Sequence, residues 1–341
     1  MTLVPRTRRS HDFSQWKAAI CAAMAVAALG AKLWIISRYA NPTPLNDEWD
    51  LQAANLFVPW RDSTLSLQQL FAAANEHRMF TTRIISLLLI AANGLWDPLL
   101  EMIVNAVIHV AFGVCILWIF GRTLDRPAFS ALALITLGLV AVPNAIENPV
   151  WGLETHFYCL LLFGLLAINA LARESAGSFA RRTVGIAAAT LSFLSLASGA
   201  LVFLVGAAVV AAKRWLGVEK GRGEWTFAAL LLAGAALALA LTPIIEAHEV
   251  YRAHSVGQFI RALSTVAGWP LASYAIVAAV VVNAPWLALV WRTCAGRRRA
   301  TTSRGCCWRS ACGTACSSPP SPSAARSAST PPAISTSAPS A

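Results

Sequence analysis

Charged residues are scarce in this chain of 341 residues. Asp, Glu, Lys and Arg together make up 13% of it, whereas apolar residues make up 57%. Soluble domains carry about 25% charged residues, and the mean hydropathy here is +0.59. This composition excludes an ordinary soluble protein. It predicts an all-α, polytopic membrane protein whose apolar runs form a bundle of transmembrane helices.

Two signatures of other protein classes are also missing. The net charge is +11, but Lys and Arg occur as short clusters between apolar runs and not as one patch, which excludes nucleic acid as a partner. The eight cysteines lack the paired CxxC spacing of a zinc site. The five that follow Arg292 form neither a metal site nor a disulfide framework: Cys294, Cys306, Cys307, Cys312 and Cys316.

Eight apolar runs have the length of a membrane span, or nearly so. They lie at roughly 18–37, 98–120, 128–146, 157–172, 183–198, 199–213, 225–245 and 270–291. The first run is about 20 residues long, which favours an uncleaved span over a signal peptide. Lys32, near its far end, can extend to the membrane interface. A tight turn at Ser198–Gly199 divides a stretch that is too long for one span.

The charges predict the side of the membrane on which each loop lies. With a cytoplasmic N-terminus, the inside segments are 1–17, 121–127, 173–182, 213–224 and the stretch from Arg292, and each holds at least two basic residues. Eleven of the sixteen acidic residues fall in the outer segments or at the outer end of a span. The positive-inside rule therefore predicts a multi-pass protein of a bacterial inner membrane with its N-terminus in the cytoplasm.

Residues 82–96 are apolar but short for a span. They offer about 14 uninterrupted residues, or about 21 Å of helix. If they crossed the membrane, every later basic cluster would face outward. We therefore expect an interfacial or re-entrant helix on the outer face.

The composition changes abruptly at Arg292. Residues 292–341 contain no Asp, Glu, Lys, Leu, Val or Phe, but they contain seven Arg and eleven Ser. A disordered cytoplasmic tail is one interpretation. A frameshift in a GC-rich gene is the favoured one, because such DNA read out of frame encodes these residues. The expected organisation is a basic N-terminus at 1–17, a membrane domain at 18–291 with an outer loop at 38–97, and this tail.

The outer loop begins with three carboxylates in the segment "NDEWD", residues 46–50. One interpretation is structural: 51–59 and 65–74 read as short helices lying on the membrane, and Asn46 or Asp47 caps the first. The other is functional. Asp47, Glu48 or Asp50 would act as a general base, and Asp47 with Glu48 would hold a divalent cation such as Mg²⁺ or Mn²⁺.

Other outer segments supply further candidates for substrate binding. Arg and His side chains bind phosphate oxygens, so Glu76-His77-Arg78 is either a phosphate site or a surface ion pair. Residues spaced by four share one helix face, and this face should meet protein or water and not lipid. Asp97, Glu101, Asn105 and His109 have this spacing, with Glu101 the functional candidate and the last two expected to bond between helices. The second outer loop adds Glu147, Glu154 and His156.

Asp47-Glu48 stands just beyond the first span. It is followed by the expected membrane-lying helices and by "RIISLLLIAANGLWDPLLEMIVNAVIHVAFGVCILWIFGR", residues 83–122. This arrangement resembles the GT-C-type membrane glycosyltransferases, the class of the protein O-mannosyltransferases and the lipid A aminoarabinose transferase. The resemblance covers roughly 18–172, and 183–291 only by topology.

The resemblance implies a function. Asp47 would be the base, and the donor would be a polyprenyl-phosphate-linked sugar whose phosphate meets His77 and Arg78. The sugar would pass to the hydroxyl of a membrane lipid or glycan outside the membrane. A transporter or flippase is the main alternative, although the chain shows no internal repeat. A non-catalytic envelope assembly protein is the third.

Overall fold

The structure is a computed structural model that describes residues 6–143, 147–173, 178–218, 221, 223–269 and 274–292, with the backbone alone for 6–14. The predicted tail at 292–341 lies outside these residues except for Arg292. The described chain is helical apart from turns and one isolated bridge between Ala74 and His77. It forms two units, residues 1–252 and 253–341.

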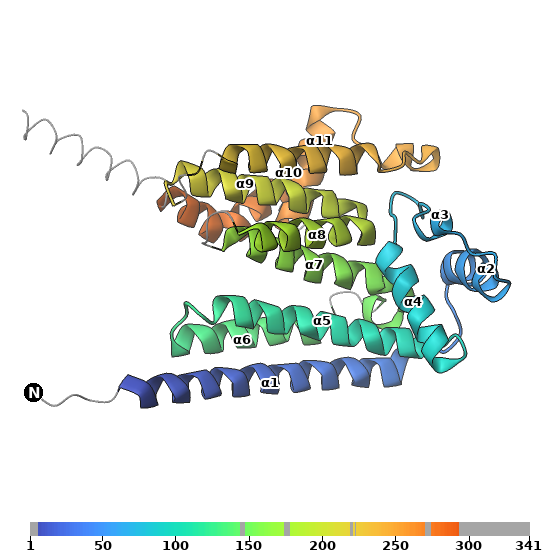
Figure 1. Cartoon of the computed structure of the whole chain (residues 1–341), viewed down its shortest axis with the longest axis horizontal. Helices are drawn as coiled ribbons and strands as arrows, with labels where there is room; N and C mark the ends of the chain where they lie inside the picture. Colours follow the sequence, from blue (N-terminus) through green and yellow to red (C-terminus); the bar gives the residue numbers. More distant parts are fainter. Residues whose placement is uncertain are drawn as a thin grey trace, which may run out of the picture. The chain divides into compact units, whose positions relative to one another are not determined.

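The long helices of the first unit lie side by side (Figure 1). They are α1 (Arg6–Tyr39), α5 (Pro98–Phe120), α6 (Arg126–Ala141), α7 (Thr155–Ala172), α8 (Phe179–Ser195), α9 (Ala200–Trp215) and α10 (Gly223–Ala240). The second unit contains α11 (Val256–Gly268) and an apolar helix at Ala275–Arg292.

Six described helices are long and apolar enough to cross a membrane. They comprise Gln15–Tyr39, Pro98–Phe120, Gly152–Ala172, Ala197–Trp215, Gly223–Ala240 and Ala275–Arg292. The predicted all-α bundle of a multi-pass membrane protein is therefore confirmed. The span predicted at 98–120 has the bounds of α5. The helix begins at Pro98, and the Asp97 side chain caps its N-terminus.

Two of the eight predicted spans correspond to helices that are shorter than the hydrocarbon core of a membrane is thick. The α6 helix has 16 residues and α8 has 17, or about 24 and 26 Å, against a hydrocarbon core of about 30 Å. The α6 helix ends at Ala141 because Val142, which precedes Pro143, is extended. The α8 helix ends at Ser195 because Leu196 is extended.

The turn predicted at Ser198–Gly199 is present. A 3-10 turn at Ala197–Gly199 follows α8, and its Gly199 N–H donates to the Leu196 carbonyl at 2.8 Å. The turn lets α8 and α9 pack against a shared core with α7 and α10, built from Leu171, Phe193, Phe203, Phe227 and Leu231 among others. A second core joins α1, α5 and α6 through residues such as Met24, Leu117 and Phe129.

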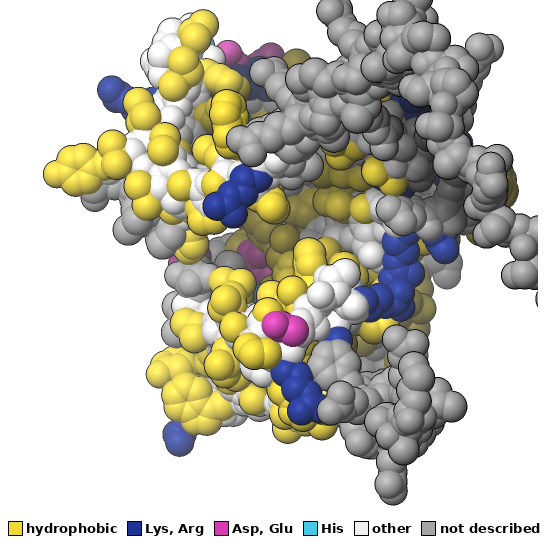
Figure 2. Space-filling view, turned by 90° about the vertical axis from the view of Figure 1, so that its left-hand side faces the viewer, with side chains coloured by type: hydrophobic (Ala, Val, Ile, Leu, Met, Phe, Trp, Pro, Cys, Tyr) yellow, Lys and Arg dark blue, Asp and Glu magenta, His cyan; other side chains and the backbone are white. Residues whose placement is uncertain are grey.

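The two ends of this bundle differ in charge. The α5–α6, α7–α8 and α9–α10 connections share one end with the start of α1 (Figure 1). We call it the basic end; it carries Arg122, Arg126, Arg173, Arg181, Arg182, Lys213 and Arg214. Figure 2 looks onto it and shows Lys and Arg side chains spread among hydrophobic ones. The opposite, acidic end carries the 40–97 loop and the 142–154 connection. That the basic end faces the cytoplasm stays a prediction.

The first outer loop contains less helix than expected. A π-helical segment at Trp49–Phe57 runs into α2 (Val58–Arg61), which agrees with the helix predicted at 51–59. The helix predicted at 65–74 is wrong: α3 (Leu67–Leu70) is a single turn, capped by Ser66. The chain then turns because the guanidinium of Arg83, in α4 (Phe80–Asn93), binds carbonyl oxygens of this segment.

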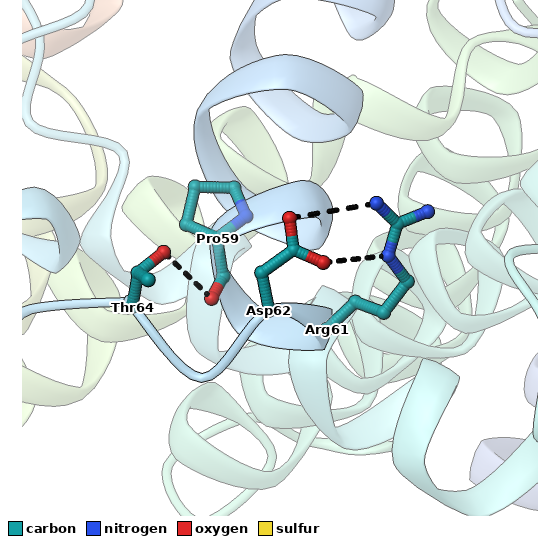
Figure 3. A network of polar contacts seen from close by, with 4 residues as sticks. All are labelled: Pro59, Arg61, Asp62 and Thr64. Carbon is teal, nitrogen blue, oxygen red and sulfur yellow. Dashed lines mark hydrogen bonds and ion pairs between the residues drawn. The ribbon is translucent and has the colours of Figure 1, made fainter.

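The end of α2 is held by local contacts. Arg61 pairs with Asp62 at 2.9 Å, and the Thr64 hydroxyl donates to the Pro59 carbonyl at 3.3 Å (Figure 3). The hydrogen bond from Arg61 lowers the pKa of Asp62 below its usual value. Because both side chains are exposed to solvent, this pair adds little to stability.

Candidate functional site

The three carboxylates of "NDEWD" have different environments. Asp47 and Asp50 are exposed, whereas Glu48 is fully buried. Its Oε2 accepts from the Leu45 N–H at 2.6 Å, and its Oε1 accepts from the Leu153 N–H at 3.1 Å. Glu48 therefore fastens the start of the first outer loop to the second outer loop.

The local backbone turns Glu48 inward. Asn46 adopts a left-handed conformation with φ of 43°, and the Glu48 N–H donates to the Leu45 carbonyl at 2.9 Å. The prediction that Asn46 or Asp47 caps the first loop helix is wrong. Glu48 occupies the N-cap position, and its side chain makes no capping bond because it is used across the loop.

Glu101 reaches the same place from the first turn of α5. It is 3% exposed, and its Oε1 accepts a 2.9 Å hydrogen bond from the Gln52 amide, which also donates to Ser86 at 2.8 Å. A β-carbon added to Gly152 would lie 2.7 Å from Glu101 Oε2 and 3.0 Å from Glu48 Oε1. The two buried carboxylates therefore meet over Gly152, and a side chain there would crowd both of them.

Asn105 holds the second outer loop against α5. Its amide donates to the Gly152 carbonyl at 2.8 Å, and its carbonyl accepts from the Thr155 hydroxyl at 2.6 Å. The predicted interhelical role of Asn105 is therefore confirmed. The polar face of α5 meets protein, as expected, because Glu101 and Asn105 are both buried.

Glu154 and His156 are also buried beneath the loop. The His156 Nδ1 lies 2.8 Å from the Leu153 carbonyl, and its ring stacks on His77 with centroids 6.3 Å apart. His77 thereby joins the first outer loop to the second. Burial lowers the pKa of His77, so the neutral ring is favoured there.

Glu76 and Arg78 bind partners other than His156. Glu76 forms an ion pair with His248, and the hydrogen bond from His248 lowers the pKa of Glu76. Arg78 donates to the carbonyls of Phe71 at 3.0 Å and Leu241 at 2.6 Å. Two nitrogens of the Arg78 guanidinium therefore hold the main chain of the first outer loop and of the segment after α10.

Buried polar atoms without a hydrogen-bond partner gather in this region. Among the described residues they include Gln52 Oε1, His77 Nδ1, Thr82 Oγ1, Glu101 Oε2 and Glu154 Oε2. Such atoms are rare in folded proteins, and each needs an explanation. Their concentration at the acidic end identifies this part of the bundle as the candidate site.

No family model, curated protein or solved structure matches this chain. The function therefore has to be inferred from the site.

The structure brings together Glu48, Glu101, Glu154, His156 and His77 beneath the loops. Of the other predicted site residues, Asp47, Asp50 and Glu147 are exposed. In the described part of the chain, no group of three or more His, Cys, Asp or Glu residues is placed to hold a metal ion. A cation held by Asp47 and Glu48 stays a prediction.

Sequence reasoning missed Gln52, Ser86 and Gly152. Gln52 carried a signal, because it lies four residues after Glu48 in an apolar helical stretch and so shares its face. Nothing in the local sequence marks Ser86 or Gly152 as part of the site. Their roles depend on how the short helix α4 and the second loop pack on α5, which no local pattern encodes.

Lys32 does not extend to the interface as expected. It is 5% exposed, and its ammonium lies 5.4 Å from the centre of the Tyr158 ring. The His109 ring lies 4.8 Å from the same tyrosine. A cation–π contact partly compensates the buried charge, and embedded ionisable residues of this kind often serve function.

The stability of the site should depend on pH through Glu48. Burial raises the pKa of Glu48, and the N–H donors of Leu45 and Leu153 only partly oppose this. The pKa of Glu in an unfolded chain is about 4.3. A group whose pKa is raised in the folded state contributes its full stability below that pH, and the contribution is lost as the pH rises through the folded-state pKa. Glu48→Gln removes the titrating group. The wild type should therefore gain stability relative to this variant as the pH falls from 8 to 5.

Thermal unfolding of both proteins in detergent across this range measures the effect. Asp50→Asn, an exposed carboxylate two residues away, is the control and should follow the wild type. If the unfolding temperatures of the wild type and Glu48→Gln depend on pH in the same way, the prediction is contradicted.

Proposed function

We propose that this protein is a membrane glycosyltransferase. It would transfer a sugar from a polyprenyl-phosphate donor to a lipid or glycan acceptor at the acidic end of the bundle, outside a bacterial inner membrane. The observation that carries the proposal is the pairing of an exposed Asp47 with a buried, hydrogen-bonded Glu48. The second carboxylate fixes the loop, and the first stays accessible.

Asp47 has the properties that the chemistry needs. In the transfer, the acceptor oxygen bonds to the anomeric carbon, the bond from that carbon to the phosphate oxygen breaks, and polyprenyl phosphate leaves. The acceptor hydroxyl must lose its proton to a base. Asp47 is exposed to an incoming hydroxyl, whereas both oxygens of Glu48 already accept main-chain hydrogen bonds. Glu48 is therefore a positioning residue.

A lipid-sized groove supports the donor assignment. It lies between α8, α9 and α10, has a volume of about 490 Å³ and is lined by apolar side chains including Phe193, Phe203 and Leu237. Leu241 also lines the groove, and its carbonyl accepts a hydrogen bond from Arg78. A guanidinium has five donors, so Arg78 retains donors for a phosphate while the prenyl chain lies in the groove.

The proposal predicts that Asp47→Asn abolishes sugar transfer. The full-length chain in membrane vesicles would be supplied with a radiolabelled polyprenyl-phosphate sugar and a lipid extract as acceptor. Loss of a general base lowers the rate by about 10² to 10⁴-fold. Asp62→Asn is the matched control, because Asp62 is another exposed aspartate of the same loop. Equal transfer by Asp47→Asn and wild type, with equal amounts in the membrane, would refute the assignment.

The embedded Lys32 and His109 favour a transporter or flippase as a second candidate. Reconstitution separates the two candidates. Movement of labelled lipid between leaflets by the wild-type chain, without any sugar transfer, would select the transporter.

A further inference from the structure

A second apolar groove opens at the basic end of the bundle. It has a volume of about 490 Å³ and is walled by apolar side chains of α5, α7 and α8, including Trp118, Phe163, Leu166 and Val184. Its lining also includes Asn169, Arg173 and Arg181. It is therefore hydrophobic along its length and cationic at one end.

Three guanidiniums gather at this end of the groove. Arg122 and Arg173 both contact the Trp118 ring, at 4.3 Å and 4.7 Å from its centre. Desolvation lowers the pKa of Arg173, and the nearby charges of Arg122 and Arg181 lower it further. Like charges held this close repel one another, so an anion between them would be stabilising.

The neighbouring Arg182 differs from these arginines because it has a carboxylate partner. It forms an ion pair with the buried Glu224 and lies over the Phe227 ring at 4.4 Å. Within the described chain, no ion pair joins Arg122 or Arg173 to a carboxylate. Glu224 therefore neutralises Arg182, whereas Arg122 and Arg173 have no such carboxylate partner in the described part of the chain.

The length of the groove fits one membrane leaflet. Along α8 it runs from Ala180 to Leu191, or about 16 Å of helix. The hydrocarbon core of a bilayer is about 30 Å thick, so the groove is about as long as the hydrocarbon of one leaflet is thick. An acyl chain whose headgroup lies at the guanidiniums would fill it.

We infer that this groove binds an anionic phospholipid from the leaflet at the basic end. The phosphate would accept hydrogen bonds from Arg122 and Arg173, and an acyl chain would lie against Trp118, Phe163 and Val184. Basic pockets between transmembrane helices bind anionic headgroups in this way, and guanidinium groups suit phosphate better than ammonium groups do. The inference does not depend on the proposed enzymatic function.

Native mass spectrometry of the full-length chain in a nonionic detergent tests this. Phosphatidylglycerol should bind at least tenfold more tightly than phosphatidylcholine with the same acyl chains. Each guanidinium near a headgroup contributes about fivefold. The combined variant Arg122→Gln and Arg173→Gln should therefore lose about 25-fold in affinity for phosphatidylglycerol.

Arg61→Gln is the matched control, because it removes an exposed arginine from the acidic end, and it should bind as the wild type does. If the combined variant does not fold, Arg122→Gln alone suffices, since this side chain is exposed, and it should lose about fivefold. Equal binding of the two lipids, or unchanged binding by the arginine variants, would overturn the inference. So would displacement of phosphatidylglycerol by millimolar inorganic phosphate, since the site would then take free phosphate.

Discussion

Replacing Gly199 with alanine should lower the free energy of unfolding by about 4 kcal/mol or more. The added β-carbon would lie 2.3 Å from the carbonyl carbon of Ser192 and 2.4 Å from the Phe193 nitrogen. Both atoms belong to the main chain of α8, so no change of rotamer can relieve the overlap. The turn between α8 and α9 must open, which pulls Phe193 and Phe203 out of the core that they share.

Gly138→Ala is the control for this prediction. Gly138 lies inside α6, and an added β-carbon would have no neighbour within 4 Å. Alanine should stabilise the helix there by about 0.5–1 kcal/mol. Thermal or denaturant unfolding in detergent measures both variants. Similar unfolding curves for the two alanine variants would show that the α8–α9 turn does not need a glycine.

The hydropathy of the sequence predicted the membrane helices better than it predicted their ends. The turn at Ser198–Gly199 was found because an apolar stretch was too long for one span. The span predicted at 128–146 ran past the true end of α6 because apolarity alone does not account for the effect of Pro143 on the residue before it. Local chemistry ends a helix even where the composition stays apolar.

The outer loop was predicted less well because its conformation depends on tertiary contacts. The second loop helix was expected from apolar periodicity, yet Arg83 binds the carbonyls of Leu70, Ala72 and Arg78. Those hydrogen bonds compete with helix formation. An arginine that follows an apolar segment gives no sign in the sequence that it will fold back onto it.

The sequence identified the acidic residues of the site but not their arrangement. Glu48 was considered alongside Asp47 and Asp50, and nothing local distinguished the three. The structure separates them, because the left-handed turn at Asn46 directs Glu48 inward to meet Glu101. Residues that are distant in sequence meet only through the packing of the second outer loop on α5.

Gly152→Ala should destabilise the candidate site by about 3 kcal/mol. The new β-carbon would lie 2.7 Å from Glu101 Oε2, 3.1 Å from Glu101 Cβ and 3.0 Å from Glu48 Oε1. The buried Glu101 carboxylate must shift, which strains the 2.9 Å hydrogen bond that its other oxygen accepts from Gln52. If the proposed function holds, sugar transfer should fall with it, because Glu48 no longer positions the loop that carries Asp47.

A double-mutant cycle with Glu101→Ala shows whether crowding of this carboxylate is the cause. Once the carboxylate is removed, the overlap at 2.7 Å no longer exists, so adding Gly152→Ala should lower the free energy of unfolding by less than about 1 kcal/mol. The small loss that is still expected comes from the contact with the β-carbon of residue 101, which alanine retains. If the effects of the two substitutions on the free energy of unfolding prove additive, Gly152→Ala does not destabilise the protein by crowding Glu101. The paired carboxylates would then lie farther from Gly152 than this structure places them.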